Sequence, residues 1–487
     1  MLQTTIRGSI TQQRLEQVSW GEKMKTLKIT STQMSVASLA LTMLLASLGV
    51  SIPNIALPSI SKHFEAVFSD TQLIIIGYLL AVTVLIVAAG KIGDLFGRKK
   101  IFLIGIVLFS AAALASGLAQ SLWMLVFARI IQGLGAAILL SLSIALMSDS
   151  VPKEKMGSVM GLMGTMSALG TASGPSLGGF LVNTFGWRSV FFFMSSVGIL
   201  SFFVAKQFVI ADREKNIFAE KKIDFFGMFV LGIALTSYSL GVTINGGHFT
   251  KANWILLAVA MFSIFAFIKV EKESQIPLLR LDLFNQTLSS NLSMNIIVST
   301  VMMSTLVVGP FYLSKGLELT PLMIGAVMSV GPLLSILTGI PSGKAVDLVG
   351  TKAMTKIGLL LMALGTTGLF ILPEIYGLYG YVSSIFILSP GYQLFQASNN
   401  AAVMEKVPEK ERGVVSGLLS LSRNIGLISG ASVMGSIFSF ASGVAEISAA
   451  SAGALSAGMR STFFVATILL LIAVAMAFFN NKQKGTL

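Results

Sequence analysis

The sequence predicts an all-α integral membrane protein in which two six-helix bundles flank two inserted helices. Only 11% of its 487 residues are charged and its mean hydropathy is +0.84, whereas about a quarter of an average soluble domain is charged. Apolar segments of about 20 residues, each long enough to cross a bilayer as a helix, recur almost end to end. The expected spans lie near 34–58, 72–90, 101–119, 122–148, 157–182, 189–209, 225–244, 254–270, 288–314, 321–343, 354–373, 377–404, 414–440 and 461–480.

The distribution of Lys and Arg supports these fourteen spans. With this count, 27 of the 34 basic residues fall on the side of the N-terminus, five fall on the other side and two lie within helices. Cytoplasmic loops carry the excess of Lys and Arg, so both termini are expected in the cytoplasm. Residues 1–33 are then a polar cytoplasmic N-terminal tail and 481–487 a C-terminal tail.

An internal repeat divides the chain. The stretch "GKIGDLFGRKK" at 90–100 returns in diluted form as "GKAVDLVGTK" at 343–352, and "VPKEKMGSVMGL" at 151–162 resembles "VPEKERGVVSGL" at 407–418. The two shifts, 253 and 256 positions, keep cytoplasmic loops cytoplasmic, as in transporters with parallel repeats around a central site. We therefore expect an N-terminal bundle at 34–210, a linker with the inserted helices at 211–287 and a C-terminal bundle at 288–480.

Composition excludes several other classes of function. The chain has no cysteine and two histidines, His63 and His248, both in expected loops, so no metal site or cofactor is expected. The net charge of +13 lies in short connectors, which makes it a topology signal rather than a nucleic-acid surface. There is no phosphate-binding loop of an ATP motor. An intramembrane enzyme or a sensor is a remote alternative, because no catalytic constellation and no large loop is present.

Several ordered motifs resemble those of one transporter family. "GKIGDLFGRKK" looks like the signature loop of the major facilitator superfamily, "RIIQGLGAA" at 129–137 its fourth-helix motif, and "GTASGPSLGG" at 170–179 the fifth-helix motif of its drug exporters. "PNIALP" at 53–58, "GWRSVFFF" at 186–193 and the span count resemble the fourteen-helix drug:proton antiporters. The resemblance implies the major facilitator fold and proton-coupled export of small amphipathic drugs, antibiotics or toxic metabolites by alternating access.

The same resemblance implies a setting and partners. The expected protein is a secondary active transporter of the bacterial inner membrane, acting as a monomer on protons and a small-molecule substrate within the lipid bilayer. A dedicated exporter of one endogenous metabolite or siderophore is the alternative within transport.

The signature loop is expected to hold a conformational latch. Its glycines permit a tight connector, and the resemblance assigns the latch to Gly90, Asp94, Gly97 and Arg98, with Asp347 in the second copy. The alternative is a topology anchor at the anionic inner surface, which is the favoured interpretation of Lys99 and Lys100.

Two further motifs lie within expected helices. Arg129 is a cation in an apolar stretch with Gln132 on the same face, and the resemblance implies that these two, with Asp94, take part in proton coupling. A structural hydrogen bond to a backbone carbonyl is the alternative. Gly174, Pro175, Gly178 and Gly179 predict a bend and tight helix packing in the fifth helix, which the resemblance assigns to the gate.

Polar side chains within the spans are candidates to line the substrate route. Asn291, Asn295 and Ser299 recur at four-residue spacing, and a second set is expected on one face of the twelfth helix. Amides inside hydrocarbon face other helices, a cavity or water, so the alternative is a contact between helices. The candidates are Asn54, Asn291, Asn295, Tyr312, Gln393, Gln396, Asn399, Asn400 and Arg423.

One departure from the family pattern concerns charge. The position at which the family's first helix usually carries an acid is Gly49, and all 21 acidic residues fall in tails, loops or helix ends. A cation entering hydrocarbon prefers a counter-charge. We therefore expect neutral, zwitterionic, anionic or weakly basic substrates rather than dications.

Overall fold

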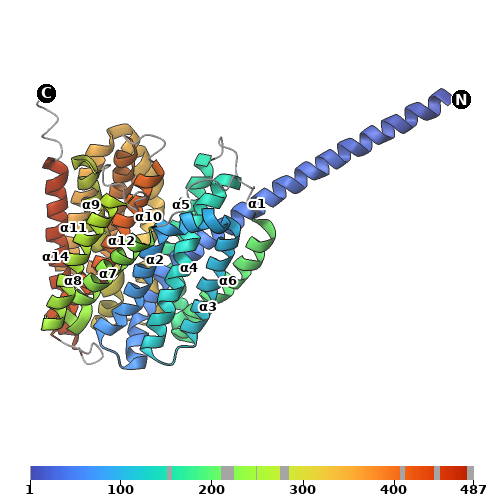
Figure 1. The fold of residues 1–487 in the computed structure, drawn as a ribbon. Coiled ribbons are helices and arrows are strands. Elements are labelled where there is room, and N and C mark those ends of the chain that lie inside the picture. The colour runs from blue at the N-terminus through green and yellow to red at the C-terminus, as the bar shows by residue number, and fades with distance from the viewer. Residues whose placement is uncertain are drawn as a thin grey trace, which may run out of the picture.

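The computed structural model consists of long helices gathered in two bundles, with one helix projecting away from them (Figure 1). It describes residues 2–150, 156–209, 224–247, 249–274, 284–405, 412–443 and 450–479, with side chains described from Gln33 onward. Within this part of the chain, 12 helical segments are long and apolar enough to cross a membrane. His248 and the expected tail 481–487 lie outside the described residues.

The N-terminal bundle comprises six helices. They are α1 (Leu2–Phe64), α2 (Phe68–Phe96), α3 (Arg98–Gly117), α4 (Leu122–Ser150), α5 (Met156–Phe185) and α6 (Arg188–Phe208). Helix α4 packs against α1, α2 and α3, while α5 and α6 pack against α1. The expected tail 1–33 is not separate from the first span, since one helix runs from Leu2 to Phe64 and its first part projects from the bundle (Figure 1).

The C-terminal bundle contains two π-helical turns, one at the end of α9 and one between α12 and α13. Its elements are α9 (Gln286–Phe311), η4 (Tyr312–Gly316), α10 (Pro321–Val349), α11 (Thr351–Met404), α12 (Arg412–Ser429), η6 (Gly430–Met434), α13 (Gly435–Ser442) and α14 (Ala452–Phe479). Because η6 joins α12 to α13, these three form one continuous span. The last helix begins at Ala452, earlier than the expected 461, so Arg460 lies inside it and pairs with Glu374 at 2.6 Å.

Helix α11 reverses direction at Gly377. This glycine has φ 52° and ψ −125°, a conformation that costs little only without a Cβ. The two arms then pack closely: a Cβ added at Gly365 meets the Cα of Leu388 at 2.8 Å, and one at Gly358 meets the backbone of Phe395 at 2.7 Å. The expected break between 373 and 377 is therefore a tight helical turn rather than a loop.

The inserted pair consists of α7 (Phe225–Thr243) and α8 (Lys251–Glu273), linked through η2 (Ile244–Gly247). Asp224 caps α7 by accepting a hydrogen bond from Gly227 N at 2.7 Å, and Thr250 with Asn253 forms a capping box at α8. In Figure 1 the pair lies on one side of the molecule, next to α2 and α12. It is therefore an addition to the two bundles.

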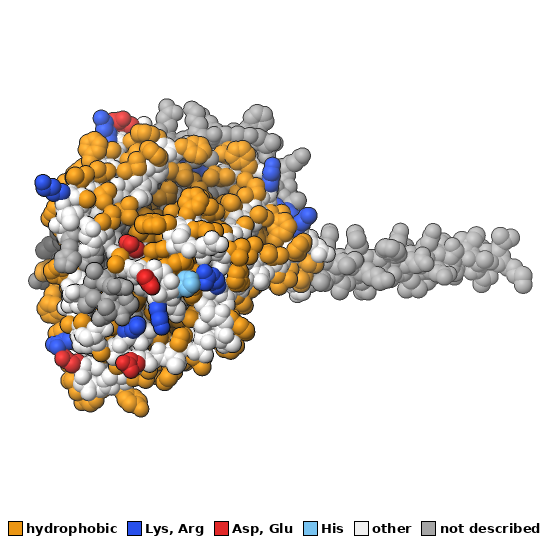
Figure 2. Space-filling model, turned by 90° about the horizontal axis from the view of Figure 1, so that it is seen from below, with side chains coloured by type: hydrophobic (Ala, Val, Ile, Leu, Met, Phe, Trp, Pro, Cys, Tyr) orange, Lys and Arg blue, Asp and Glu red, His pale blue; other side chains and the backbone are white. Residues whose placement is uncertain are grey.

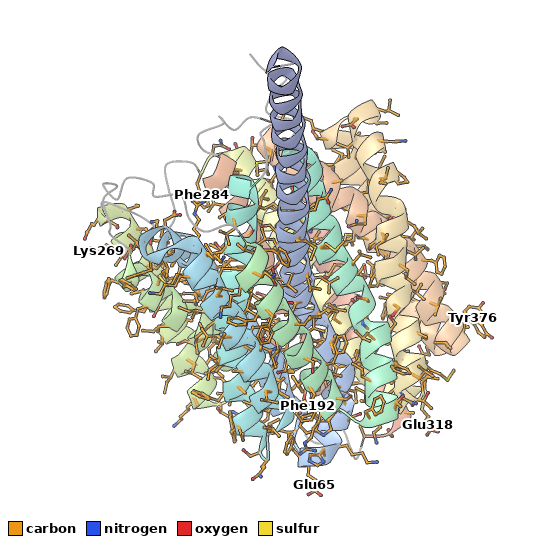
Figure 3. All side chains as sticks on the ribbon, turned by 90° about the vertical axis from the view of Figure 1, so that its right-hand side faces the viewer. Glu65, Phe192, Lys269, Phe284, Glu318 and Tyr376 are labelled. Carbon is orange, nitrogen blue, oxygen red and sulfur yellow. The ribbon has the colours of Figure 1, made fainter. Side chains whose placement is uncertain are left out.

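Loops alternate between the two ends of the molecule. In Figure 3, Glu65 after α1 and Glu318 before α10 lie at the lower end, while Lys269 of α8 and Phe284 before α9 lie at the upper end. Figure 2 looks onto the lower end, where a few acidic and basic side chains, some of them side by side, lie among apolar and uncharged ones. By the distribution of basic residues, the lower end is the one expected outside the cell.

The two copies of the signature loop share one backbone conformation. Gly97 separates α2 from α3 with φ 95°, and Gly350 separates α10 from α11 with φ 94°. Glycine adopts positive φ without the steric cost of a Cβ, and each copy has a glycine at the turn. The repeat in the sequence thus corresponds to a repeat in the backbone.

Candidate functional site: the inter-bundle route

Arg129 lies at the centre of the N-terminal bundle and is fully buried. Its Nη2 donates to Gly49 O at 2.8 Å, its Nε to Ile74 O at 3.3 Å and its Nη1 to Gln132 Oε1 at 2.6 Å. Arg129 therefore joins α4 to both α1 and α2. Gln132, one turn further along α4, lies in contact with it as its spacing predicts.

Tyr78 occupies the space that a side chain at position 49 would fill. The guanidinium carbon of Arg129 lies 4.1 Å from the centre of the Tyr78 ring, a cation–π arrangement that stabilises a desolvated cation. A Cβ added at Gly49 would meet the Tyr78 hydroxyl at 2.7 Å, and that hydroxyl donates to Ala46 O at 3.0 Å. An aromatic ring and two carbonyls thus surround the cation where the family pattern has an acid.

Asp94 is not brought to Arg129. It forms an exposed ion pair with Arg98, whose Nε lies 2.6 Å from Asp94 Oδ1. Ile74, whose carbonyl accepts from Arg129, precedes Asp94 by 20 residues on the same helix. At a rise of 1.5 Å per residue the two positions are about 30 Å apart. Of the expected coupling residues, the structure therefore brings Arg129 and Gln132 together and leaves Asp94 in the signature loop. In the two copies of that loop, Gly90 lies beside Ser141, whereas its counterpart Gly343 has open space around it.

The glycines of α5 allow this helix to pack closely against its neighbours. A Cβ at Gly174 would collide with Ser51 Oγ, and one at Gly178 would lie 3.2 Å from Ile52 O, both on α1. Gly179 faces α10 instead, where an added Cβ meets Pro321 O at 2.6 Å. The motif around Pro175 therefore packs α5 against its own bundle and against the other one.

The C-terminal bundle contains a cluster of amides between α9, α11 and α12. Asn295 Nδ2 donates to Ser422 Oγ at 2.8 Å and to Leu419 O at 3.1 Å, and Gln396 Nε2 donates to Asn295 Oδ1 at 3.4 Å. Asn291 is also buried. These bonds show that Asn295 serves at least as a contact between helices.

The four amides expected on one face of the twelfth helix have different surroundings. Gln393 Nε2 donates to Ser335 O of α10 at 3.0 Å, whereas Gln396 reaches α9. Asn399 is fully buried and, among the described residues, neither of its amide atoms has a hydrogen-bond partner. Asn400 is exposed. The single expected polar face is therefore divided between two helix contacts, an interior position and the surface.

The remaining candidates also separate. Asn54 is buried and donates to Val50 O of its own helix at 2.8 Å. Tyr312 lies in the π-helical turn η4, where its ring stacks on Tyr381 at 6.4 Å and its hydroxyl donates to Pro373 O at 3.5 Å. Arg423 is exposed, unlike Arg129.

One set of contacts was not predicted and closes the lower end between the bundles; we call it the closed end. The Phe68 ring of α2 meets the rings of Phe311 at 4.8 Å and Phe438 at 5.3 Å. Beside it, Gln72 Nε2 donates to Ala431 O of η6 at 2.7 Å. π-helical turns such as η6 are frequent at functional sites. Gln72 lies at the edge of an expected span, where a polar residue is ordinary, so the sequence did not indicate this contact.

From its middle to its upper end, α10 is poorly covered. Within 333–349 only Ser342 and Val346 are buried, and Leu337, Ile340 and Leu348 have exposed fractions of 72%, 74% and 86%. The two bundles are therefore tightly packed at the lower end, while α10 has little cover toward Val349.

Comparison with known proteins agrees with this architecture. The riboflavin transporter RibZ of Clostridioides difficile is 27% identical over 400 residues, covering 81% of this chain and 85% of its own. The multidrug transporter protein MdtP of Bacillus subtilis is 26% identical over 413 residues, covering 84% and 75%. Both relatives are transporters, and this chain is a membrane transporter rather than an enzyme.

Solved structures match the fold over most of the chain. A peptide transporter POT in complex with sulfate superposes with a TM-score of 0.66 at 15% identity, covering 91% of this chain and 94% of that one. A point mutant of the nucleoside transporter NupG gives 0.64 at 11%, covering 93% and 100%. Residues 39–431 match the sequence profile of one family, and the chain belongs to the Major Facilitator Superfamily.

Proposed function

We propose that the protein exports small amphipathic compounds from a bacterial cell by alternating access of its two bundles, driven by the proton gradient. The observation that supports this most is the difference in helix packing between the two ends of the molecule. The bundles meet at Phe68, Gln72 and Phe438 at one end, whereas α10 is exposed at the other. An exporter in this state receives its substrate from the exposed end.

The proposed topology has fourteen spans with both termini in the cytoplasm. Counting α5 as a span and the two arms of α11 separately raises the 12 membrane-length segments to fourteen. The exposed end then faces the cytoplasm, in agreement with the distribution of basic residues. The membrane is the bacterial inner membrane, and the acting unit is the monomer.

Coupling to protons is proposed to involve Arg129 and Gln132. Arg129 links α1, α2 and α4 through single hydrogen bonds and a ring contact, so a change in any partner moves three helices. The substrate is proposed to be neutral, zwitterionic, anionic or weakly basic, because in the described spans Arg129 is surrounded by carbonyls, an amide and a ring rather than by a carboxylate. Gln393, Gln396 and Asn399 are the proposed polar contacts of the route.

The test is transport by purified protein in proteoliposomes under an imposed pH gradient, with compounds that span substrate charge. We expect uphill transport of uncharged and anionic amphiphiles to collapse when the gradient is dissipated. Efficient transport of a dication contradicts the proposed substrate class, and transport unaffected by the gradient contradicts the coupling.

A second candidate is a dedicated exporter of one endogenous metabolite. It is favoured by the likeness to a relative named for a single compound, riboflavin, and by none of the site geometry. Two measurements on a deletion strain distinguish the candidates: the metabolites in its medium and its susceptibility to a panel of drugs. One metabolite missing from the medium with unchanged susceptibilities supports the dedicated exporter.

A further inference from the structure

Besides contacts of α1 with α9 and α10, the two bundles meet along two lines of contact, which we call seams. In the first seam α2 lies against α12, η6 and α13, and in the second α5 lies against α10. Both seams run through the part of the molecule that the membrane surrounds. Whatever covers a seam decides whether lipid and lipid-dissolved compounds reach the space between the bundles.

One face of α7 lies across the first seam. Leu231 and Leu235 are buried in an apolar cluster that includes Ala88 of α2 and borders on Ile425 of α12. Tyr238 and Val242 of α7 follow these leucines at spacings that place all four on one helix face. The inserted pair is therefore attached to both bundles along a single face.

The contacts of α7 with the two bundles differ in kind. With the C-terminal bundle it forms two hydrogen bonds: Tyr238 Oη donates to Ser429 Oγ at 3.0 Å, and Ser436 Oγ donates to Val242 O at 2.9 Å. With α2 the described contacts are apolar, and a Cβ added at Gly232 would lie 3.7 Å from Val84 Cγ2. No hydrogen bond joins α7 to α2 among the described side chains.

This difference matters when the bundles move. A hydrogen bond broken inside hydrocarbon leaves two polar groups without water to replace the partner, so the pair Tyr238–Ser429 resists separation. Apolar contacts have no direction and re-form after a shift. Helix α7 is thus held to the C-terminal bundle by hydrogen bonds and to α2 by apolar contacts.

Helix α8 completes the cover from outside. It packs against α7, while its other face exposes Trp254, Phe262 and Phe265 with fractions of 64%, 76% and 66%. That face is suited to lipid. The order outward from the first seam is therefore α2 with α12, then α7, then α8.

We propose that the inserted pair seals the first seam against lipid throughout the transport cycle, with α7 travelling with the C-terminal bundle and sliding over α2. Amphipathic compounds dissolved in the bilayer then enter through the second seam beyond the close contact of Gly179 with Gly325, where α10 exposes Leu337 and Ile340 further along its length. Behind that exposed face, Gln393 of α11 donates to Ser335 O of α10, so the entrance leads to a polar side chain. This inference rests on the proposed export by alternating access.

The sliding is tested with cysteine pairs, because the chain has no cysteine of its own. One variant carries Val84→Cys with Gly232→Cys, which joins α7 to α2, and the other carries Tyr238→Cys with Ser429→Cys, which joins α7 to α12. Each is cross-linked with the same short, reducible reagent. We expect the α2 link to reduce export at least tenfold, with recovery on reduction, and the α12 link to leave export unchanged.

Either reversal overturns the proposal: export that survives the α2 link, or export that stops with the α12 link. Each variant before cross-linking is its own reference, so a folding defect is recognised at once. If the variants export no compound of the panel even before cross-linking, and the parent protein fails as well, the proposed function is wrong rather than the sealing.

The entrance is tested with a bulky hydrophilic maleimide attached after folding. Ile340→Cys on α10 and Phe262→Cys on α8 are matched positions, exposed by 74% and 76%. We expect the label at 340 to slow export of a lipophilic compound severalfold and the label at 262 to have no effect. Equal effects at both positions, or none at 340, contradict entry through the second seam.

Discussion

The interiors of the two bundles are held together by different chemistry. In the N-terminal bundle one fully buried cation, Arg129, has all three of its guanidinium nitrogens hydrogen-bonded and a ring against it. In the C-terminal bundle amides bridge the helices, and Asn399 retains donor and acceptor capacity that no described residue uses. Each guanidinium nitrogen of Arg129 thus has a partner, whereas neither amide atom of Asn399 has one among the described residues. Several simultaneous partners hold one geometry, whereas unused polar capacity in the interior can be satisfied by a substrate or by a second conformation.

The largest effect is expected from Arg129→Ala. It removes the hydrogen bonds that join α4 to α1 and α2. Gly49 O then loses its side-chain donor, and the usual helical donor four residues on is missing because that position is Pro53, which is costly in the membrane interior. We expect loss of gradient-driven export by about 100-fold, which corresponds to roughly 2.7 kcal/mol. Transport in proteoliposomes is the measurement, with size-exclusion profiles to establish folding.

Arg129→Lys is the matched variant, because it keeps the charge but not the forked geometry. If lysine restores export, charge alone is required. If it fails while the protein remains folded, the simultaneous contacts with α1, α2 and Gln132 are required.

Gln72→Leu is expected to weaken the closed end, where the two interiors meet. The side chain keeps its volume but loses the hydrogen bond to Ala431 O, a net contribution of about 1 kcal/mol, or roughly a fivefold shift in population. The readout is the rate at which Ser432→Cys, buried in the structure, reacts with a membrane-impermeant maleimide.

Thr71→Val is the control for this experiment. Thr71 is equally buried next to Gln72, but among the described residues its hydroxyl donates only to Val67 O, which is close in sequence. The thiol is expected to react faster in the Gln72 variant and at the parent rate in the Thr71 variant. Equal rates in both variants mean that Gln72 does not hold this end closed.

The sequence was sufficient for features set by composition and local backbone. Apolar length located most of the helices, although the first begins at Leu2 rather than 34 and the last at Ala452 rather than 461. The glycines of the signature loop predicted a tight connector, which lies at Gly97 and recurs at Gly350. It was insufficient where distant side chains meet. Tyr78 is one aromatic residue in an apolar run, and only the fold shows that its hydroxyl fills the space beside Gly49.

Other differences have similar causes. The last helix starts at Ala452, so Arg460 lies inside it and pairs with Glu374, a contact between segments distant in sequence. The four amides of the second arm of α11 separate because α9 and α10 both pack near it, and periodicity alone does not reveal which neighbour each residue faces. The π-helical turns leave no signal that hydropathy detects.

Asn399 and Asn295 offer a contrast within the C-terminal bundle. Asn399→Leu removes an amide that lacks a partner among the described residues, so we expect a higher melting temperature, since a buried unsatisfied amide costs about 1–3 kcal/mol. Asn295→Leu breaks bonds to Ser422 and Leu419 and is expected to lower it. A thermal shift assay in detergent measures both.

Export by the Asn399 variant then decides its role. A more stable protein with impaired export identifies Asn399 as a contact of the substrate or of a second conformation. A more stable protein with normal export leaves it as a structural position, and a less stable one contradicts the absence of a partner.

The smallest effect on stability is expected from the latch loop. The Asp94–Arg98 pair is partly exposed, with side-chain fractions of 56% and 25%, and such pairs contribute less than about 1 kcal/mol. The Glu374–Arg460 pair at the other end is similarly exposed, at 53% and 46%, and equally short at 2.6 Å. Arg98→Ala and Arg460→Ala are therefore matched changes whose melting temperatures are both expected to lie close to that of the parent.

The export rates of these two variants distinguish the two interpretations of the signature loop. If the loop is a conformational latch, Arg98→Ala changes the export rate severalfold and Arg460→Ala does not; if it is only a topology anchor, both variants export at the parent rate.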